Sequence, residues 1–332
     1  MEKKKVVVVG GGTGTHTALR GLKNYSDQLE LGVVVSMSDS GGSAGRLRDE
    51  FGFLPVGDIR NVLTALASEG DENYQLLRQL FSYRFSRGGG LSGHNFGNLF
   101  LTALTDILGD EVLAIEAAAK ILRITGKVIP VTKDNVHLVA KYADGRVIFG
   151  EHYIDEPSIA NLPRITELSL TPMASLTPLA YEVLTTADMI VFGPGDLYTS
   201  ILANCVVDGF KEAVAKSSAK LVYVCNLMSK AGQTVGMTAK DHTQEIQKYI
   251  NRHLNAVLVN TDNLPADLVE KYQGEGDHPI LNNLTADLPF KVVARPLMAS
   301  EEVKLAGGDV LKRSLIRHDS DKLAKALVEI LG

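Results

Sequence analysis

Four consecutive valines, Val6–Val9, run directly into the glycine-rich stretch Gly10–Thr15. A short run of β-branched residues is typical of a strand that is buried on both faces of a parallel sheet. The glycines that follow permit a tight turn and a close approach of the backbone to a ligand. If a helix begins there, its unpaired N–H groups and positive end point at one place. This feature therefore predicts a strand–loop–helix unit with an anion site.

A second segment has the same form. Met189–Phe192 is an apolar run, and Gly193-Pro194-Gly195-Asp196 follows it. Strands of a parallel sheet end at a common edge, and ligands bind in the crevice outside that edge. Two glycine loops at one edge predict a ligand that carries a phosphate or a diphosphate.

Further short runs rich in Val and Ile alternate with helix-like stretches, which favours a doubly wound α/β sheet. One region differs, because Val136–Tyr142 and Arg146–Tyr153 flank Ala143-Asp144-Gly145, and Asp-Gly is a strong hairpin signal. Farther upstream, Asp110 is expected to cap a helix. We predict one unit over residues 1–332, with a mostly parallel sheet and an antiparallel hairpin insertion at about 127–172.

Composition excludes several classes of function. The formal net charge of the 332 residues is -5, with no dense block of Lys and Arg, so nucleic-acid binding is disfavoured. No apolar run approaches the length of a membrane span. The two cysteines, Cys205 and Cys225, give no disulfide framework, and we expect a reduced, cytoplasmic protein.

The segment Ser38–Arg48 follows the second predicted strand and combines glycines, hydroxyls and two arginines. Such a segment suits an anion, because backbone N–H groups and guanidinium groups both donate to phosphate oxygens. Asp39 is placed to hold a ribose hydroxyl or a metal ion. The alternative is a solvated surface loop. The candidates here are Asp39, Gly41, Gly42, Ser43 and Arg46.

Two polar segments precede apolar helix patterns. Pro55–Asn61 contains Asp58, for which a helix N-cap is the commoner explanation, and it also contains Asn61. Gly93–Asn98 contains His94, Asn95 and Asn98. His94 is suited to donating to a phosphate or passing a proton, although a single loop histidine is often structural.

The second glycine loop carries hydroxyls at Thr199 and Ser200, which suit phosphate oxygens, but Asp196 repels an anion unless a cation or a sugar hydroxyl intervenes. A helix entry capped by Asp196 or Thr199 is the plain alternative. Asn226 follows the next strand and is suited to a base or a sugar. The sequence shows neither metal-ligand spacing nor a Ser-His-Asp elbow.

Taken together, these segments resemble the family of 2-phospho-L-lactate transferases and gluconeogenesis factors. The resemblance covers nearly the whole chain and lies in G-G-G-T-G, D-x-G-G-S-x-G-R-L-R, P-x-G-D-I-R-N, G-H-x-x-G-N-L, G-P-G-x-L-Y-T-S, C-N-L-M and Arg317-His318-Asp319. It implies a Rossmann-like three-layer fold and a homodimer. Within the family the chain looks like the gluconeogenesis-factor branch, which is implicated in bacterial cell shape and envelope maintenance on gluconeogenic carbon sources and binds UDP-sugars, notably UDP-N-acetylglucosamine.

The chain departs from the family pattern at three positions. Ser40 stands where a second acidic residue is frequent, which weakens a magnesium-dependent transfer. Asp196 replaces a usual Ser, and Ala203 replaces a usual Pro, and both changes affect the second loop.

We therefore expect a cytoplasmic regulatory protein that binds a UDP-sugar or another dinucleotide-like ligand and requires no cofactor. The expected binding residues are Gly11, Gly12, Thr13, Gly14, Asp39, Gly41, Gly42, Ser43, Arg46, Asp58, Asn61, His94, Asn95, Asn98, Gly193, Gly195, Thr199, Ser200 and Asn226. The rival is a magnesium-dependent phosphotransferase of the 2-phospho-L-lactate transferase type, with His94 or Asp39 handling a proton or a metal. A nicotinamide-dependent oxidoreductase ranks third, because the G-x-G-x-x-G fingerprint that starts at Gly10 ends at Thr15.

Overall fold

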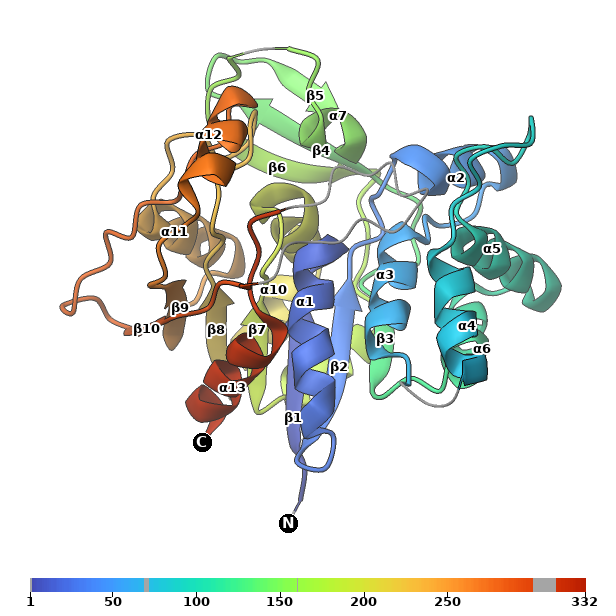
Figure 1. The fold of residues 1–332 in the computed structure, drawn as a ribbon, viewed down its shortest axis with the longest axis horizontal. Coiled ribbons are helices and arrows are strands. Elements are labelled where there is room, and N and C mark those ends of the chain that lie inside the picture. Colours follow the sequence, from blue (N-terminus) through green and yellow to red (C-terminus); the bar gives the residue numbers. More distant parts are fainter. Residues whose placement is uncertain (1, 69–71, 160, 301–314) are drawn as a thin grey trace.

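A computed structural model describes residues 2–68, 72–159, 161–300 and 315–332. Its centre is a seven-stranded sheet with the order β10-β9-β8-β7-β1-β2-β3, and every pair of neighbouring strands is parallel (Figure 1). The predicted mostly parallel α/β fold is confirmed. The strands are β1 (Lys4–Val9), β2 (Leu29–Val35), β3 (Lys127–Pro130), β7 (Met189–Phe192), β8 (Lys220–Val224), β9 (Ala256–Asn260) and β10 (Lys291–Arg295).

The strand order reverses at β1. From β1 the sheet runs through β2 to β3 on one side, and through β7, β8 and β9 to β10 on the other. Val6 is aligned with Leu31 of β2 and with Met189 of β7, and Val6–Val9 are all buried. The crevice at such a switch point is where open α/β sheets bind ligands. Both glycine loops begin there, because one follows β1 and the other follows β7.

Helices cover both faces of the sheet. α1, α3 and α13 pack together on one face, whereas α8, α10 and α11 pack together on the other. The helices are α1 (Gly12–Leu22), α2 (Gly42–Phe51), α3 (Gly57–Leu66), α4 (Glu72–Ser82), α5 (Phe96–Leu108), α6 (Glu111–Ile121), α7 (Glu151–Asp155), α8 (Pro178–Thr186), α9 (Ala203–Cys205), α10 (Phe210–Lys216), α11 (Ala239–Ile250), α12 (Ala266–Gly274) and α13 (Ser320–Leu331), with the short helices η1 (Lys23–Tyr25) and η2 (Leu197–Leu202).

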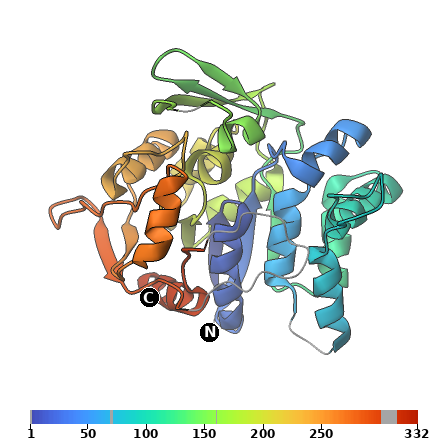
Figure 2. The ribbon, with the colours of Figure 1, turned by 45° about the horizontal axis from the view of Figure 1, so that its top comes forward.

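A separate three-stranded antiparallel sheet lies beyond the carboxyl edge of the main sheet (Figures 1 and 2). It consists of β4 (His137–Tyr142), β5 (Val147–Phe149) and β6 (Ile165–Thr171). The hairpin predicted around Asp144-Gly145 joins β4 to β5. The expected boundary at 127 differs from the structure, because β3 pairs with β2 in the main sheet. The antiparallel part therefore begins only at β4.

The helix cap predicted at Asp110 is present in the structure. The Asp110 side chain caps α6 by accepting the N–H groups of Val112 and Leu113 at 2.8 and 3.0 Å, as predicted. A continuous apolar core includes buried residues of both sheets, such as Val8 and Leu138. Over the described part of the chain, the helices are all too short or too polar to cross a bilayer.

Candidate functional site

The two glycine loops lie directly against each other. A Cβ added at Gly14 would lie only 2.4 Å from the Pro194 carbonyl oxygen, and one added at Gly195 would lie 3.5 Å from the Gly11 carbonyl oxygen. The Thr15 hydroxyl donates to the same Pro194 oxygen over 3.5 Å. The structure thus brings the two predicted loops together at the switch point. Only a residue without a side chain fits at Gly14 without moving the loops.

Asp58 is not the N-cap of its own helix, which was the role that the sequence predicted. α3 begins at Gly57 with Val56 as its N-cap, so Asp58 lies in the first turn and does not cap its own helix. Its Oδ1 instead accepts the N–H of Gly12, the first residue of α1, over 2.8 Å. A Cβ at Gly11 would lie 2.1 Å from Asp58 Oδ2, so the carboxylate fills the space beside this loop. The N-terminus of α1 already has a carboxylate acceptor.

Asp39 lies close enough to Asp58 for the two carboxylates to repel each other. Asp39 Oδ1 accepts the Gly41 N–H over 2.9 Å, beside the start of α2. Burial raises the pKa of Asp39, although the Gly41 N–H and the nearby Arg60 guanidinium oppose that rise. Burial and the Asp39 charge raise the pKa of Asp58 to about 7. Asp58 therefore keeps its proton to a higher pH than an isolated aspartate does.

The short helix α7, which follows the β4–β5 hairpin, adds carboxylates that sequence reasoning missed. Glu151 Oε2 accepts the Ser40 N–H over 3.4 Å, and the His152 N–H donates to the Ser40 hydroxyl over 3.0 Å. Burial, and then the charges of Asp39 and Asp155, raise the pKa of Glu151 well above its usual value. The only sequence signal near α7 was the hairpin, which does not show where its end will dock.

Lys230 is a second residue that sequence reasoning missed, and it lies among acidic groups. Its Nζ is 3.4 Å from Asp155 Oδ2 and 3.9 Å from Asp196 Oδ2. Burial alone would lower the pKa of Lys230, but Asp196 and Asp155 outweigh burial and raise it. Asp155 also accepts from the Thr199 hydroxyl at 3.3 Å and from the Gln233 amide at 3.1 Å. Helix α7 thus connects the small sheet to the second loop and to the segment after β8.

The helix η2, which follows the second glycine loop, has no side-chain cap at its N-terminus. Asp196 precedes η2 but makes no side-chain capping bond, and burial raises its pKa to about 6. Asn226, at the end of β8, holds Gly195 in place by donating to its carbonyl at 2.7 Å and accepting its N–H at 3.3 Å. Asn226 therefore positions the loop, and its amide is engaged in doing so.

The polar residues of the Gly93–Asn98 segment form a network between α2 and α5. His94 is buried, and its Nδ1 lies 3.2 Å from the Ser43 hydroxyl, which also accepts the Asn95 N–H at 3.1 Å. Asn95 caps α5 through the Asn98 N–H at 3.2 Å. Burial, together with the Arg46 charge, lowers the pKa of His94, so the imidazole is neutral at pH 7. This network links the first turn of α2 to the start of α5.

The remaining predicted residues are spread around the crevice. Arg46 is exposed, and both of its terminal nitrogens donate to the Ser92 carbonyl, at 3.3 and 3.2 Å. Asn61 accepts from the adjacent Arg60 at 2.6 Å. Gly12, Gly42 and Gly193 have φ values of 66°, 50° and 75°, a left-handed conformation that favours glycine. Thr13 lies in the first turn of α1, and Ser200 lies within η2.

Two helix starts in this crevice, at α2 and η2, have no side-chain cap. The acidic groups Asp39, Asp58 and Asp155 lie near one another, and the cations Arg60 and Lys230 lie close to them. Within the described ranges, no three Asp, Glu, His or Cys side chains are grouped closely enough to hold a metal ion. The fold and this crevice define a doubly wound α/β protein with a polar site of mixed charge at its switch point.

Comparison with known proteins agrees with this class. The family described as 2-phospho-L-lactate transferase CofD matches residues 6–298, and the chain belongs to that family. The gluconeogenesis factor of Bacillus subtilis (strain 168) is 38% identical over 339 residues, which span 99% of each chain. That of Halalkalibacterium halodurans is also 38% identical, over 99% of this chain and 97% of the relative. A crystal structure of a UPF0052 family member from Bacillus halodurans superposes with a TM-score of 0.88, at 36% identity and 99% coverage of both chains. The predicted family resemblance is confirmed.

Proposed function

We propose that this protein is a cytoplasmic, homodimeric regulatory protein that binds a nucleotide sugar, with a UDP-sugar as its ligand. The observation that carries the proposal is the contact between the two glycine loops at the switch point, where Gly14 and Gly195 lie against the opposite loop. Such crevices bind nucleotides through backbone N–H groups that no side chain covers. The α2 and η2 starts supply such groups, whereas Asp58 already takes the Gly12 N–H.

The charges of the crevice support a sugar-linked diphosphate over a simple anion. The acidic side chains of Asp39, Asp58 and Asp155 disfavour a bare phosphate, but carboxyl groups accept hydrogen bonds from ribose and pyranose hydroxyls. Lys230 and Arg60 supply positive charge for the phosphate oxygens. A ligand with both hydroxyls and a diphosphate matches this mixture.

Regulation is the role that the relatives' names support. The curated relatives from Bacillus subtilis and Halalkalibacterium halodurans are named gluconeogenesis factors. We extend that role to this chain and propose that nucleotide-sugar binding reports on cell-envelope precursors during growth on gluconeogenic carbon, with an effect on cell shape. Binding without turnover is what such a sensor requires.

The family description favours a second candidate, a magnesium-dependent transferase. The neighbouring carboxyl groups of Asp39 and Asp58 fit this ion, since Mg²⁺ is usually held by one or two carboxylates together with ligand phosphates. These two residues would hold it, and the ion would neutralise charge on a leaving diphosphate. Ser40 leaves this set one carboxylate short of the frequent family pattern, so we rank the transferase second.

A thermal-shift panel tests the proposal. UDP-sugars, GDP, NAD and NADP are each added in excess, with and without magnesium. A ligand that binds only the folded state raises the melting temperature with the logarithm of its concentration. We expect UDP-N-acetylglucosamine to give the largest rise, with or without magnesium. A panel in which no nucleotide raises the melting temperature would contradict nucleotide binding, and a rise restricted to GDP with magnesium would favour the transferase.

A further inference from the structure

A cavity of about 150 Å³ lies at the carboxyl ends of β8 and β9, next to the second glycine loop. Its lining includes Asn226, Ala239, Val259, Asp262, Leu264 and Asn282. Asn226 both lines the cavity and bonds to Gly195 in both directions. The cavity therefore adjoins the second glycine loop.

The walls of the cavity combine apolar residues with the polar side chains of Asn226, Asn260, Asp262 and Asn282. Val259 and Ala239 are buried wall residues, and Leu264 is half-buried. Among the described residues, the Asp262 carboxylate uses Oδ2 to accept the Met298 N–H at 2.8 Å, and Oδ1 has no partner. Asn282 accepts the Leu284 N–H through Oδ1 at 3.2 Å, and its Nδ2 has no partner within the same described part of the chain. Because the Asn226 and Asn260 amides already bond to the protein, the partly apolar cavity offers one acceptor and one donor, which suits a flat heterocycle better than a pyranose, whose hydroxyls need many partners.

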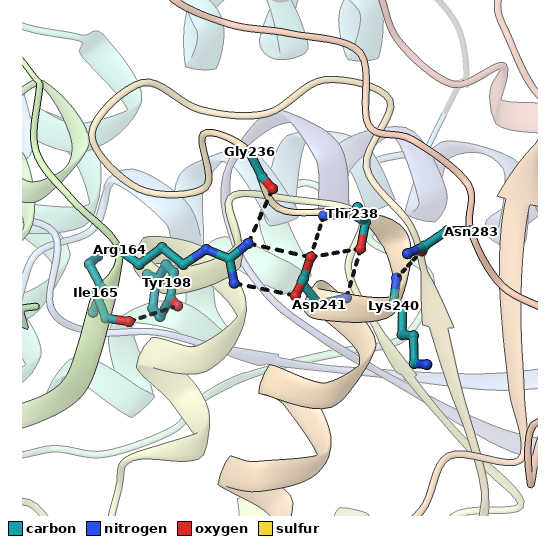
Figure 3. Close-up of polar contacts among 8 residues, drawn as sticks. All are labelled: Arg164, Ile165, Tyr198, Gly236, Thr238, Lys240, Asp241 and Asn283. Atoms are coloured by element: carbon teal, nitrogen blue, oxygen red, sulfur yellow. Dashed lines mark hydrogen bonds and ion pairs between the residues drawn. The ribbon is translucent and has the colours of Figure 1, made fainter.

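Hydrogen bonds hold the cavity wall in place. The Ala239 N–H donates to the Leu281 carbonyl at 3.0 Å, and the Lys240 N–H donates to Asn283 Oδ1 at 3.1 Å. Figure 3 shows that Arg164, which directly precedes β6, points at Asp241 beside the Thr238 cap of α11. Arg164 also donates to the Gly236 carbonyl at 3.1 Å. These contacts fix the α11 start against the Pro279–Asn282 segment, so the cavity is formed without a ligand.

The volume limits what the cavity can hold. A cavity of about 150 Å³ in another protein binds benzene, which is a single six-membered ring. A pyrimidine has one such ring, whereas a purine has two fused rings. Resting on the nucleotide-sugar function proposed above, we infer that this cavity receives the base of the ligand and selects a pyrimidine over a purine. The donor edge of the base would face Asp262, and a carbonyl of the base would face Asn282.

Substitutions of Leu264, which lines the cavity, can either reduce or increase the volume of the cavity. Leu264→Trp fills the cavity, and Leu264→Ala enlarges it. Leu281→Trp is the matched control, because Leu281 is 66% exposed and lies outside the cavity lining. Calorimetric titrations with UDP, UDP-N-acetylglucosamine, GDP and inorganic pyrophosphate are carried out on each variant, after thermal unfolding has shown that it folds.

We expect the wild type to bind UDP at least tenfold more tightly than GDP. Leu264→Trp should weaken UDP and UDP-N-acetylglucosamine equally, by at least tenfold, without changing pyrophosphate. Leu264→Ala should narrow the preference for UDP over GDP, and Leu281→Trp should change nothing. Equal wild-type affinities for UDP and GDP, or unchanged UDP affinity in a folded Leu264→Trp variant, would overturn the base assignment while nucleotide binding stands. Loss confined to UDP-N-acetylglucosamine would place the sugar in the cavity and also overturn it. If no nucleotide binds the wild type, both this inference and the proposed function fail.

Discussion

The Gly12 N–H donates to Asp58 Oδ1 over 2.8 Å, so the first turn of α3 supplies a carboxyl acceptor to the N-terminus of α1. A helix start of this kind would otherwise attract a phosphate. The bond orients Asp58 toward the first glycine loop and keeps it near Asp39. The crevice consequently contains carboxylates in the place where sequence reasoning expected a phosphate.

The Asp58 carboxyl predicts a pH dependence of stability. Its pKa in the folded protein is about 7, above that of an unfolded aspartate, because of burial and the Asp39 charge. The folded state then binds more protons than the unfolded state, so this contribution to stability is complete below about pH 4 and is lost as pH rises to about 7.

Asp58→Asn keeps an oxygen for the Gly12 N–H but cannot ionise. We expect the free energy of unfolding of the variant, measured in urea, to fall less between pH 5 and pH 7.5 than that of the wild type. Asp188→Asn is the control, because the pKa of Asp188 is lowered by its bond to the Lys5 N–H, so its contribution does not change across this range. Identical slopes in Asp58→Asn and the wild type would show that Asp58 is ionised throughout.

The ion pairs of Lys230 predict that its removal destabilises the protein, because Asp155 and Asp196 then lose their cation. We expect Lys230→Met to lower the free energy of unfolding by about 1–3 kcal/mol at pH 8, below the range for fully buried pairs because these side chains are partly exposed. The loss should be smaller at pH 5, where the Asp196 carboxyl, with a pKa of about 6, is protonated.

Lys4→Met is the matched control, since Lys4 and Asp188 form a surface pair at 3.2 Å. Exposed pairs of this type contribute only about 0–1 kcal/mol. Equal losses from Lys230→Met and Lys4→Met would mean that Lys230 stabilises nothing in the crevice.

The contact between the loops predicts the effect of a single methyl group. Alanine inside a helix is normally favoured over glycine by about 1 kcal/mol. At Gly14 in α1, however, the new Cβ would lie 2.4 Å from the Pro194 carbonyl oxygen, which is backbone. We expect Gly14→Ala to destabilise the protein by about 1–3 kcal/mol in urea unfolding. Gly89→Ala meets nothing within 4 Å and should stay within about 0.5 kcal/mol. Increased stability in Gly14→Ala would show that the loops do not pack as described.

Turnover separates the regulator from the transferase. We expect a saturating UDP-sugar to remain intact for hours with the protein and magnesium, as followed by phosphorus NMR with and without candidate acceptors. The reason is the single carboxylate at Asp39-Ser40, which leaves a cation one oxygen ligand short. Turnover that disappears in Asp39→Asn would instead establish the transferase.

The sequence predicted the parallel sheet and both glycine loops because those features are local. Val6–Val9 and Met189–Phe192 are buried strands, and each ends in glycines whose backbone then enters a helix. The hairpin signal at Asp144-Gly145 was equally local. Its start was misplaced because Lys127–Pro130 is short, and only its pairing with β2 assigns it to the main sheet.

The parts of the site that the sequence did not predict depend on contacts between segments that are far apart in the chain. Asp58 was expected to cap its own helix, but its partner Gly12 lies 46 residues away. Glu151 and Asp155 reach the crevice because the small sheet folds over the carboxyl edge, and Lys230 reaches it from the segment after β8. These contacts join residues that are far apart in the sequence, so residue spacing within one segment cannot predict them.

Calorimetric titration of UDP-N-acetylglucosamine into the wild type and Gly12→Ala tests the central claim most directly. Gly12 has a φ of 66°, and an added Cβ would lie 3.6 Å from the hydroxyl of Ser200 in η2, which follows the second glycine loop. We predict saturable binding to the wild type, at least a tenfold weaker affinity in a folded Gly12→Ala variant, and wild-type affinity in Gly89→Ala. The absence of binding to the wild type, or equal affinity in a folded Gly12→Ala variant, would contradict a nucleotide-sugar site between the glycine loops.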